Sequence, residues 1–172
     1  SQTSEFCSAN GISNQEYYVK LIRRLITLLS TFTKSGVAYE LDTRLRPSGN
    51  SGVLVTSLAA FMEYHQNSLP WEHQALLKAR VIAGHPDPAW QKEVQECLKQ
   101  ILVQWVPPID LNEQIDRLRS RKEKELAQET SRIKNLKEGY GGLLDIEYLT
   151  QYLQLKHIRN IPGLYDCQTL SA

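Results

Sequence analysis

The 172-residue sequence has little that would mark a secreted, zinc-binding or membrane-spanning protein. Its three cysteines, Cys7, Cys97 and Cys167, lie far apart and form neither a C-x-x-C pair nor a zinc-ligand spacing. This favours a reducing, cytoplasmic setting with ordinary thiols. No apolar run approaches bilayer length and no secretory signal opens the chain, so we expect a cytoplasmic protein with no membrane partner.

The sequence also lacks an excess of either charge. Lysine plus arginine number 20 and aspartate plus glutamate 19, a balance that argues against a dedicated nucleic-acid-binding protein. Apolar residues make up 41% of the chain, which is enough for a hydrophobic core. The length fits one domain of ordinary size or two small ones.

The common catalytic motifs are missing as well. No Ser–His–Asp order, P-loop or dinucleotide fingerprint is present. The four histidines do not cluster in the sequence, and we expect each to be structural or exposed: His65, His73, His85 and His157.

The hydrophobic pattern is helical over most of the chain. Ser13-Asn-Gln-Glu16 has the spacing of a capping box, and it predicts a helix that ends near Gly36. A second capping-box pattern begins at Asp110. We expect further helices over residues 58–64, 71–83, 89–106, 110–129 and 143–157.

Proline and glycine divide the chain into parts. The segment Gly84-His-Pro-Asp-Pro88 is a firm break, and the composition shifts after it. We therefore expect residues 1–88 and 89–172 to form separate parts, with a further subdomain boundary at Pro107-Pro108.

The helix expected over residues 110–129 is densely charged. The favoured interpretation is a solvated face with ion pairs between residues four apart, and ligand binding is the alternative. Its basic residues include Arg117, Arg119, Arg121, Lys122 and Lys124.

The stretch from Tyr39 to Gly52 combines a charged strand pattern with a polar loop. Residues alternate from Val37 to Arg46, so that one face is largely apolar. The opposite face carries Glu40, Asp42, Arg44 and Arg46. The following loop is rich in Gly, Ser and Asn and should leave backbone N–H groups free to meet an anion. Val53–Thr56 is expected to be a second strand or an extended segment.

Asp42 is the candidate for chemistry on this strand. A carboxylate there can hold Mg²⁺ and orient a nucleophile in phosphoryl or nucleotidyl transfer. Such a site usually needs more than one carboxylate, and no Gly-Ser-x-Asp-x-Asp type sequence lies upstream. The alternative is that Asp42 is a strand residue in a salt bridge with Arg44.

Three blocks of the sequence resemble the signature of the glutamine synthetase adenylyltransferase family, in the family's order and spacing. They are Tyr39-Glu-Leu-Asp-Thr-Arg-Leu-Arg-Pro-Ser-Gly-Asn-Ser-Gly-Val-Leu-Val55, Trp71-Glu-His-Gln-Ala-Leu-Leu-Lys-Ala-Arg80 and Gly141-Gly-Leu-Leu-Asp-Ile-Glu-Tyr-Leu-Thr-Gln-Tyr152. The resemblance implies a bifunctional enzyme with two similar nucleotidyltransferase halves. One half attaches AMP from ATP to a tyrosine of glutamine synthetase, and the other removes it by phosphorolysis, under the control of glutamine and the PII protein.

The resemblance also implies roles for particular residues. Asp42 looks like the third carboxylate of an Mg²⁺ site whose paired aspartates, in a Ser-Asp-x-Asp-Leu context, precede the first residue of this chain. Arg44 and Arg46 would contact substrate or phosphate, or hold Asp42 in place, and Glu40 is a further candidate. Backbone contacts to the nucleotide would come from Ser48, Gly49, Asn50, Ser51 and Gly52.

The last block contains two more candidates, Asp145 and Glu147. They sit two residues apart on the expected helix and so do not share a face. One of them is expected to cap the preceding loop or to reach back to an arginine of the strand.

The resemblance favours the transferring half of the enzyme, because that half typically shows Pro47-Ser-Gly49 and the Trp71 to Ala75 sequence. The adenylyl-removing half and a non-catalytic helical docking module for glutamine synthetase or PII are the alternatives. The expected fold is mainly α (α+β), the remnant of a nucleotidyltransferase α/β domain with one or two strands followed by a helical bundle. Without the paired aspartates, the chain alone is expected to be inactive.

Overall fold

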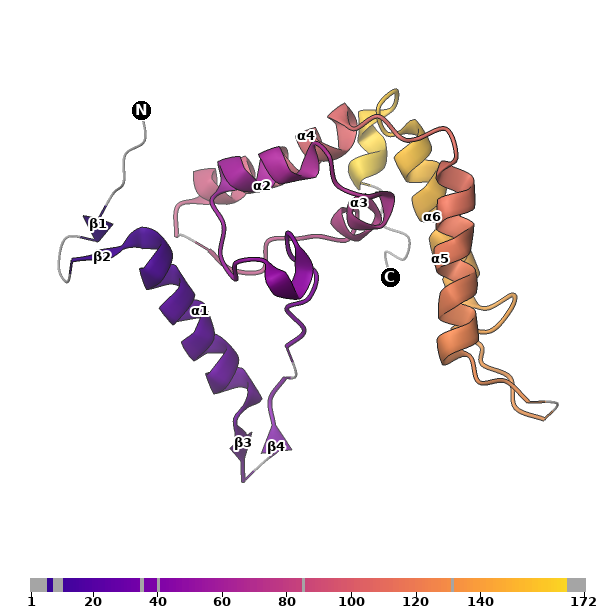
Figure 1. The fold of residues 1–172 in the computed structure, drawn as a ribbon, viewed down its shortest axis with the longest axis horizontal. Helices are drawn as coiled ribbons and strands as arrows, with labels where there is room; N and C mark the ends of the chain where they lie inside the picture. The colour runs from indigo at the N-terminus through magenta and orange to yellow at the C-terminus, as the bar shows by residue number, and fades with distance from the viewer. Residues whose placement is uncertain are drawn as a thin grey trace. The chain divides into compact units, whose positions relative to one another are not determined.

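A computed structural model describes residues 6–7, 11–34, 36–39, 41–84, 86–130 and 132–166. Over these ranges the chain is mainly helical with a few short strands (Figure 1), as predicted. It forms two compact units, Ser1–Phe61 and Met62–Ala172, so the division falls within helix α2 (Leu58–His65). The division expected between residues 88 and 89 stays a prediction. Among the described residues, no helix combines the length and apolarity needed to cross a bilayer.

Helix α1 (Asn14–Ser30) dominates the first unit and follows the short antiparallel pair β1 (Phe6–Cys7) and β2 (Ile12–Ser13). Ser13 caps α1 as predicted, its hydroxyl accepting the backbone N–H of Glu16 at 3.2 Å. The helix ends well before the predicted Gly36. Near its end, hydroxyl groups donate to main-chain carbonyls one turn earlier, an arrangement that bends helices; they belong to Thr27, Ser30 and Thr31.

A hairpin follows at the C-terminal end of α1, formed by β3 (Phe32–Thr33) and β4 (Gly36–Val37) (Figure 1). Gly36 does not end the helix but lies in this hairpin with φ +97°, a backbone conformation that suits glycine. The backbone N–H of Tyr39 then donates to the carbonyl of Leu29 at 3.1 Å and ties the returning chain to α1.

The strand predicted from Val37 to Arg46 is wrong beyond Val37. Residues 41–44 have no ladder partner in the described part of the chain, and Val53–Thr56 is an extended segment with bends, not a paired strand. A strand exists only when a neighbour accepts its hydrogen bonds, which alternation in one segment cannot supply. The Asp42 side chain instead takes the backbone N–H of Arg44, the local competition that aspartate offers to sheet pairing.

The second unit contains α3 (Pro70–Leu76), α4 (Pro88–Gln104), α5 (Leu111–Leu126), α6 (Leu143–His157) and the short 3₁₀ helix η2 (Pro162–Asp166). Helix α5 packs along α6 (Figure 1). The core is built from aliphatic and aromatic side chains of these helices, including Leu102, Leu111, Ile115, Leu144, Tyr148, Leu155 and Ile158.

The predicted helices of this unit are present, with two corrections. Helix α3 is shorter than the predicted 71–83, because the N–H groups of Lys78 and Ala79 switch to the carbonyls three residues back, which tightens and ends the last turn. The capping box at Asp110 is absent: its carboxylate accepts the side-chain amide of Gln114 at 3.0 Å and makes no cap hydrogen bond.

Two histidines meet in the core of the second unit, contrary to the expectation that no histidines cluster. The rings of His65 and His73 lie 5.9 Å apart, and His73 stacks on Trp105 at 4.1 Å. His73 is fully buried, and its Nδ1 lies 3.2 Å from the carbonyl of Leu69. Because a carbonyl only accepts, Nδ1 carries the proton, and Nε2 is buried without a hydrogen-bond partner in the described part of the chain. Their structural role agrees with the prediction; His85 lies outside the described residues.

We predict that the second unit loses stability as the pH falls below about 6.5. Burial lowers the pKa of His65 and of His73 below the ordinary value of 6.5, so the unfolded chain binds protons in a pH range where the folded chain does not. The urea midpoint, followed by far-UV circular dichroism, should therefore be constant above pH 7 and fall towards pH 5.

His73→Phe provides the matched comparison. Phenylalanine keeps an aromatic ring against Trp105 but cannot be protonated, so the variant should be less stable at pH 8 and show a weaker decline on acidification. An unchanged pH dependence in this variant would refute a role for His73.

Candidate functional site

Asp42 and Arg44 form an exposed ion pair with two parallel hydrogen bonds. Carboxylate Oδ1 of Asp42 accepts from Nε of Arg44 at 2.9 Å and Oδ2 accepts from Nη2 at 2.7 Å, while Oδ1 also accepts the Arg44 backbone N–H at 2.9 Å. These hydrogen bonds lower the pKa of Asp42 to about 2. Since the side chains of Asp42 and Arg44 are 54% and 74% exposed, the pair contributes little to stability. The result is an ionised carboxylate held in one orientation and open to solvent.

Arg46 closes the loop that follows this pair. Its guanidinium donates to the carbonyl of Thr43 at 2.5 Å and to the carbonyls of Asn50 and Gly52 at 3.4 Å. A Cβ at Gly52 would lie 1.9 Å from the carbonyl oxygen of Pro47, so the turn requires glycine there. Arg46 is therefore half-buried in the loop that it shapes.

The loop is a tight turn around the 3₁₀ helix η1 (Gly49–Ser51). The N–H groups of Gly49, Ser51 and Gly52 donate to main-chain carbonyls of the same segment at 2.8–3.2 Å. The expectation that these groups are free to meet an anion is therefore wrong at those three positions. The loop instead exposes the polar side chains of Ser48, Asn50 and Ser51.

The described residues supply one possible ligand for Mg²⁺ and not a whole site. Mg²⁺ requires near-octahedral oxygen ligands, and within the ranges that the structure describes no group of three or more His, Cys, Asp or Glu side chains could hold an ion. Glu40 lies outside the described residues. Both oxygens of Asp42 already accept from Arg44, so an ion there would share the carboxylate with a guanidinium.

Asp145, in the first turn of α6, has a structural role. Its Oδ1 accepts a hydrogen bond from Nε of Arg119, and its Oδ2 accepts the backbone N–H of Gly141 at 2.6 Å. Of the two roles predicted for this pair of acids, capping of the preceding loop is confirmed. The arginine that Asp145 reaches belongs to α5 and not to the segment around Asp42.

Glu147 joins α6 to the end of α3. Its carboxylate forms an ion pair with Lys78 and accepts the side-chain amide of Gln151 at 3.0 Å. Gln151 in turn accepts the amide of Gln74 from α3 at 2.6 Å, and both glutamines are buried. Glu147 therefore anchors a line of polar contacts from α6 to α3.

Arg119 is the residue that sequence reasoning missed. The ion pairs expected on α5 are present, for example between Glu113 and Arg117 at 3.0 Å, but the Arg119 side chain is only 8% exposed. The available signal was its position, four residues after Ile115 and eight after Leu111, which places it on the buried stripe of the helix. Its guanidinium also donates to the Gly139 carbonyl at 2.9 Å.

Comparison with known proteins places the segment with this carboxylate and polar loop in a family. The family model of glutamate-ammonia ligase adenylyltransferase matches residues 1–95, more than half of the chain, including the Asp42 segment. The chain belongs to this family. The resemblance inferred from the three sequence blocks is thereby confirmed.

The rest of the chain and one relative extend the comparison. Residues 110–172, which contain α5 and α6, match the family model of GlnD PII-uridylyltransferase. The bifunctional glutamine synthetase adenylyltransferase/adenylyl-removing enzyme of Hahella chejuensis (strain KCTC 2396) is 39% identical over 160 residues. That alignment covers 90% of this chain but 16% of the relative.

We predict that Asp145→Ala destabilises the second unit by about 1–3 kcal/mol, because it leaves the buried guanidinium of Arg119 without its main anionic partner. Urea unfolding at neutral pH measures the effect. Asp116→Ala, which removes an exposed carboxylate from α5, is the control and should change stability by less than about 0.5 kcal/mol. Equal effects of the two substitutions would show that the Arg119 contact is not structural.

Proposed function

We propose that this chain is part of an enzyme that transfers AMP from ATP to a tyrosine of glutamine synthetase. The observation that carries the proposal is the match of the adenylyltransferase family model over the segment with the exposed Asp42–Arg44 pair. The Hahella relative bears both an adenylyltransferase and an adenylyl-removing name. Because the chain spans 16% of that relative, the activity, substrates and partners of the whole enzyme are inferences for this chain.

In this proposal Asp42 supplies one ligand to Mg²⁺, the ion that would neutralise phosphate charge during transfer. The low pKa of Asp42 keeps it anionic at any physiological pH, and Arg44 fixes its orientation. The other metal ligands are not among the described residues.

The nucleotide would lie against the loop shaped by Arg46. The loop would donate hydrogen bonds to the nucleotide from the exposed side chains of Ser48, Asn50 and Ser51, because the backbone N–H groups of Gly49 and Gly52 already donate within the loop. In the reaction the tyrosine hydroxyl attacks the α-phosphorus of ATP in line. A new oxygen–phosphorus bond forms, the bond to the β-phosphate bridge breaks, pyrophosphate leaves and the hydroxyl proton is released.

Pro47-Ser-Gly49 favours the transferring half of a bifunctional enzyme. In this proposal the whole enzyme acts in the cytoplasm under the control of glutamine and the PII protein, and it binds neither nucleic acid nor a membrane. The adenylyl-removing half would run a different reaction, attack of phosphate on the adenylylated tyrosine with release of ADP. Assays of a full-length protein containing these residues in both directions separate the two. A docking module would support neither reaction through Asp42.

We predict that Asp42→Asn, in a full-length protein containing these residues, lowers AMP transfer from radiolabelled ATP to glutamine synthetase by about 100-fold or more, because a metal ligand contributes several kcal/mol to transition-state stabilisation. The matched control is Glu16→Gln. It breaks a comparably exposed ion pair, with Lys20 on α1, and should leave transfer unchanged. Full activity of Asp42→Asn would defeat the metal role and favour a docking module.

We also predict that a protein consisting of these 172 residues alone does not adenylylate glutamine synthetase in the presence of ATP and Mg²⁺. It holds no Gly-Ser-x-Asp-x-Asp sequence to complete a metal site around Asp42. Incorporation of label above a no-enzyme blank, abolished by Asp42→Asn, would contradict this prediction.

A further inference from the structure

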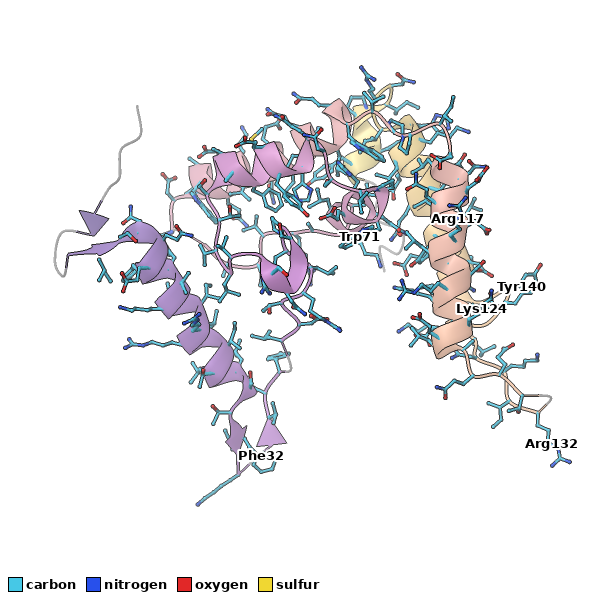
Figure 2. All side chains as sticks on the ribbon, viewed as in Figure 1. Phe32, Trp71, Arg117, Lys124, Arg132 and Tyr140 are labelled. Carbon is cyan, nitrogen blue, oxygen red and sulfur yellow. The ribbon has the colours of Figure 1, made fainter. Side chains whose placement is uncertain are left out.

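One side of α6 carries a row of uncovered apolar side chains. Four of its large apolar residues, here called the α6 face, are each 45–59% exposed: Leu143, Ile146, Leu149 and Leu153. Their spacing of three or four residues places them along one side of the helix, over about 15 Å at a rise of 1.5 Å per residue. Exposed apolar residues also precede the helix, among them Tyr140 (Figure 2). The α6 face is therefore long enough to contact another helix over about three turns.

The other side of α6 is already packed. Leu144, Tyr148 and Leu155 are buried, and the helix contacts α3 and α5. Helix α6 is thus apolar on both sides, whereas a surface helix keeps one polar face. A helix that is apolar all round is typical of the interior of a larger structure, and a row of exposed apolar residues marks a contact surface.

The charges beside the α6 face are unbalanced. Lys156 is exposed at its C-terminal end and donates to the hydroxyl of Tyr152 at 3.1 Å. Among the side chains that the structure describes, no carboxylate pairs with Lys156. Both acids of α6, Asp145 and Glu147, are already paired with basic residues of other segments. An occupant with a carboxylate beside Lys156 would therefore complement this edge.

A second uncovered helix indicates where the occupant comes from. Helix α1, which the structure describes throughout, has no buried residue, and its Leu21, Leu25 and Leu28 are exposed. A two-fold dimer pairs one patch with the same patch of the other copy, so it would need a separate interface for each unit. A longer polypeptide can cover both helices. The Hahella relative is such a polypeptide, since the alignment covers only 16% of it.

We propose that the α6 face packs against a further helix of the same polypeptide in a full-length protein containing these residues. The partner helix is amphipathic, with an apolar side on Leu149 and a carboxylate at the edge that meets Lys156. This goes beyond the proposed function, because it concerns how the second unit is completed and does not involve the Asp42 segment.

The test is the accessibility of a thiol introduced by Leu149→Cys in the full-length protein. Alkylation by iodoacetamide is followed by mass spectrometry of the peptide that contains residue 149, so the native cysteines do not interfere. The rate in the native protein is compared with the rate in urea. If the face is packed, alkylation requires local opening, and we expect the native protein to react about tenfold more slowly or less. Native and unfolded protein reacting alike would overturn the proposal.

Arg117→Cys is the matched control. Arg117 lies on α5 (Figure 2), and its side chain is 72% exposed, so its replacement should react at nearly the same rate in native and unfolded protein. Ile146→Cys should be protected like Leu149→Cys, which guards against a local disturbance at one position. Equal protection of residues 117 and 149 would overturn packing on the α6 face in particular.

The same assay separates the possible occupants. Protection that disappears on dilution of the protein would assign the α6 face to a second copy. Protection that requires added glutamine synthetase or PII protein would assign it to that partner. Either result would overturn the proposal, which expects protection in the protein alone at every concentration.

Charge reversal tests the carboxylate edge. Lys156→Glu, combined with Leu149→Cys, should speed alkylation of the full-length protein about two- to fivefold, because a favourable pair becomes repulsive. Lys92→Glu makes the same change of net charge at an exposed residue of α4 and should leave the rate unchanged. Equal rates in the two variants would overturn the acidic edge of the partner helix.

Discussion

The burial of Arg119 is the constraint on which the helical unit depends. A guanidinium cannot lie in a hydrophobic interior without partners, because burying an unpaired charge costs several kcal/mol. Arg119 takes its partners from the segment that follows α5, namely the carbonyl of Gly139 and the carboxylate of Asp145. It thereby fixes the end of a long connection and the start of α6 against α5. Apolar side chains of the two helices, among them Ile115 of α5 and Leu144 and Tyr148 of α6, are buried.

The remaining polar contacts of α6 follow from that placement. Once its first turn is fixed, Glu147 comes within reach of Lys78 and Gln151 meets Gln74. A buried glutamine pair is favourable only when its hydrogen bonds are satisfied, so this contact also selects one packing of α3 against α6.

The helices were predictable from sequence because their signals are local. The period of apolar residues placed α6 at its observed bounds, and the capping-box pattern placed Ser13 at its observed cap. The strand predicted around Asp42 failed because strand pairing depends on a neighbour elsewhere in the chain, whereas Arg44 is two residues away and binds the Asp42 carboxylate locally. His65 and His73 escaped prediction for a similar reason: a cluster formed across two short helices has no fixed sequence period.

The carboxylates of the family blocks separate by burial into two kinds. Asp145 pairs with Arg119 of α5 and Glu147 with Lys78, which follows α3, so replacing either acid would first disturb packing. Within the described part of the chain, the Asp42 side chain bonds only to Arg44, and both side chains are exposed. The fold therefore gains little from an aspartate at that position. We infer a chemical role for this pair because the fold gains little from it and two parallel hydrogen bonds orient the carboxylate. For this reason the catalytic proposal rests on Asp42, and not on the acids of α6 that the sequence blocks presented beside it.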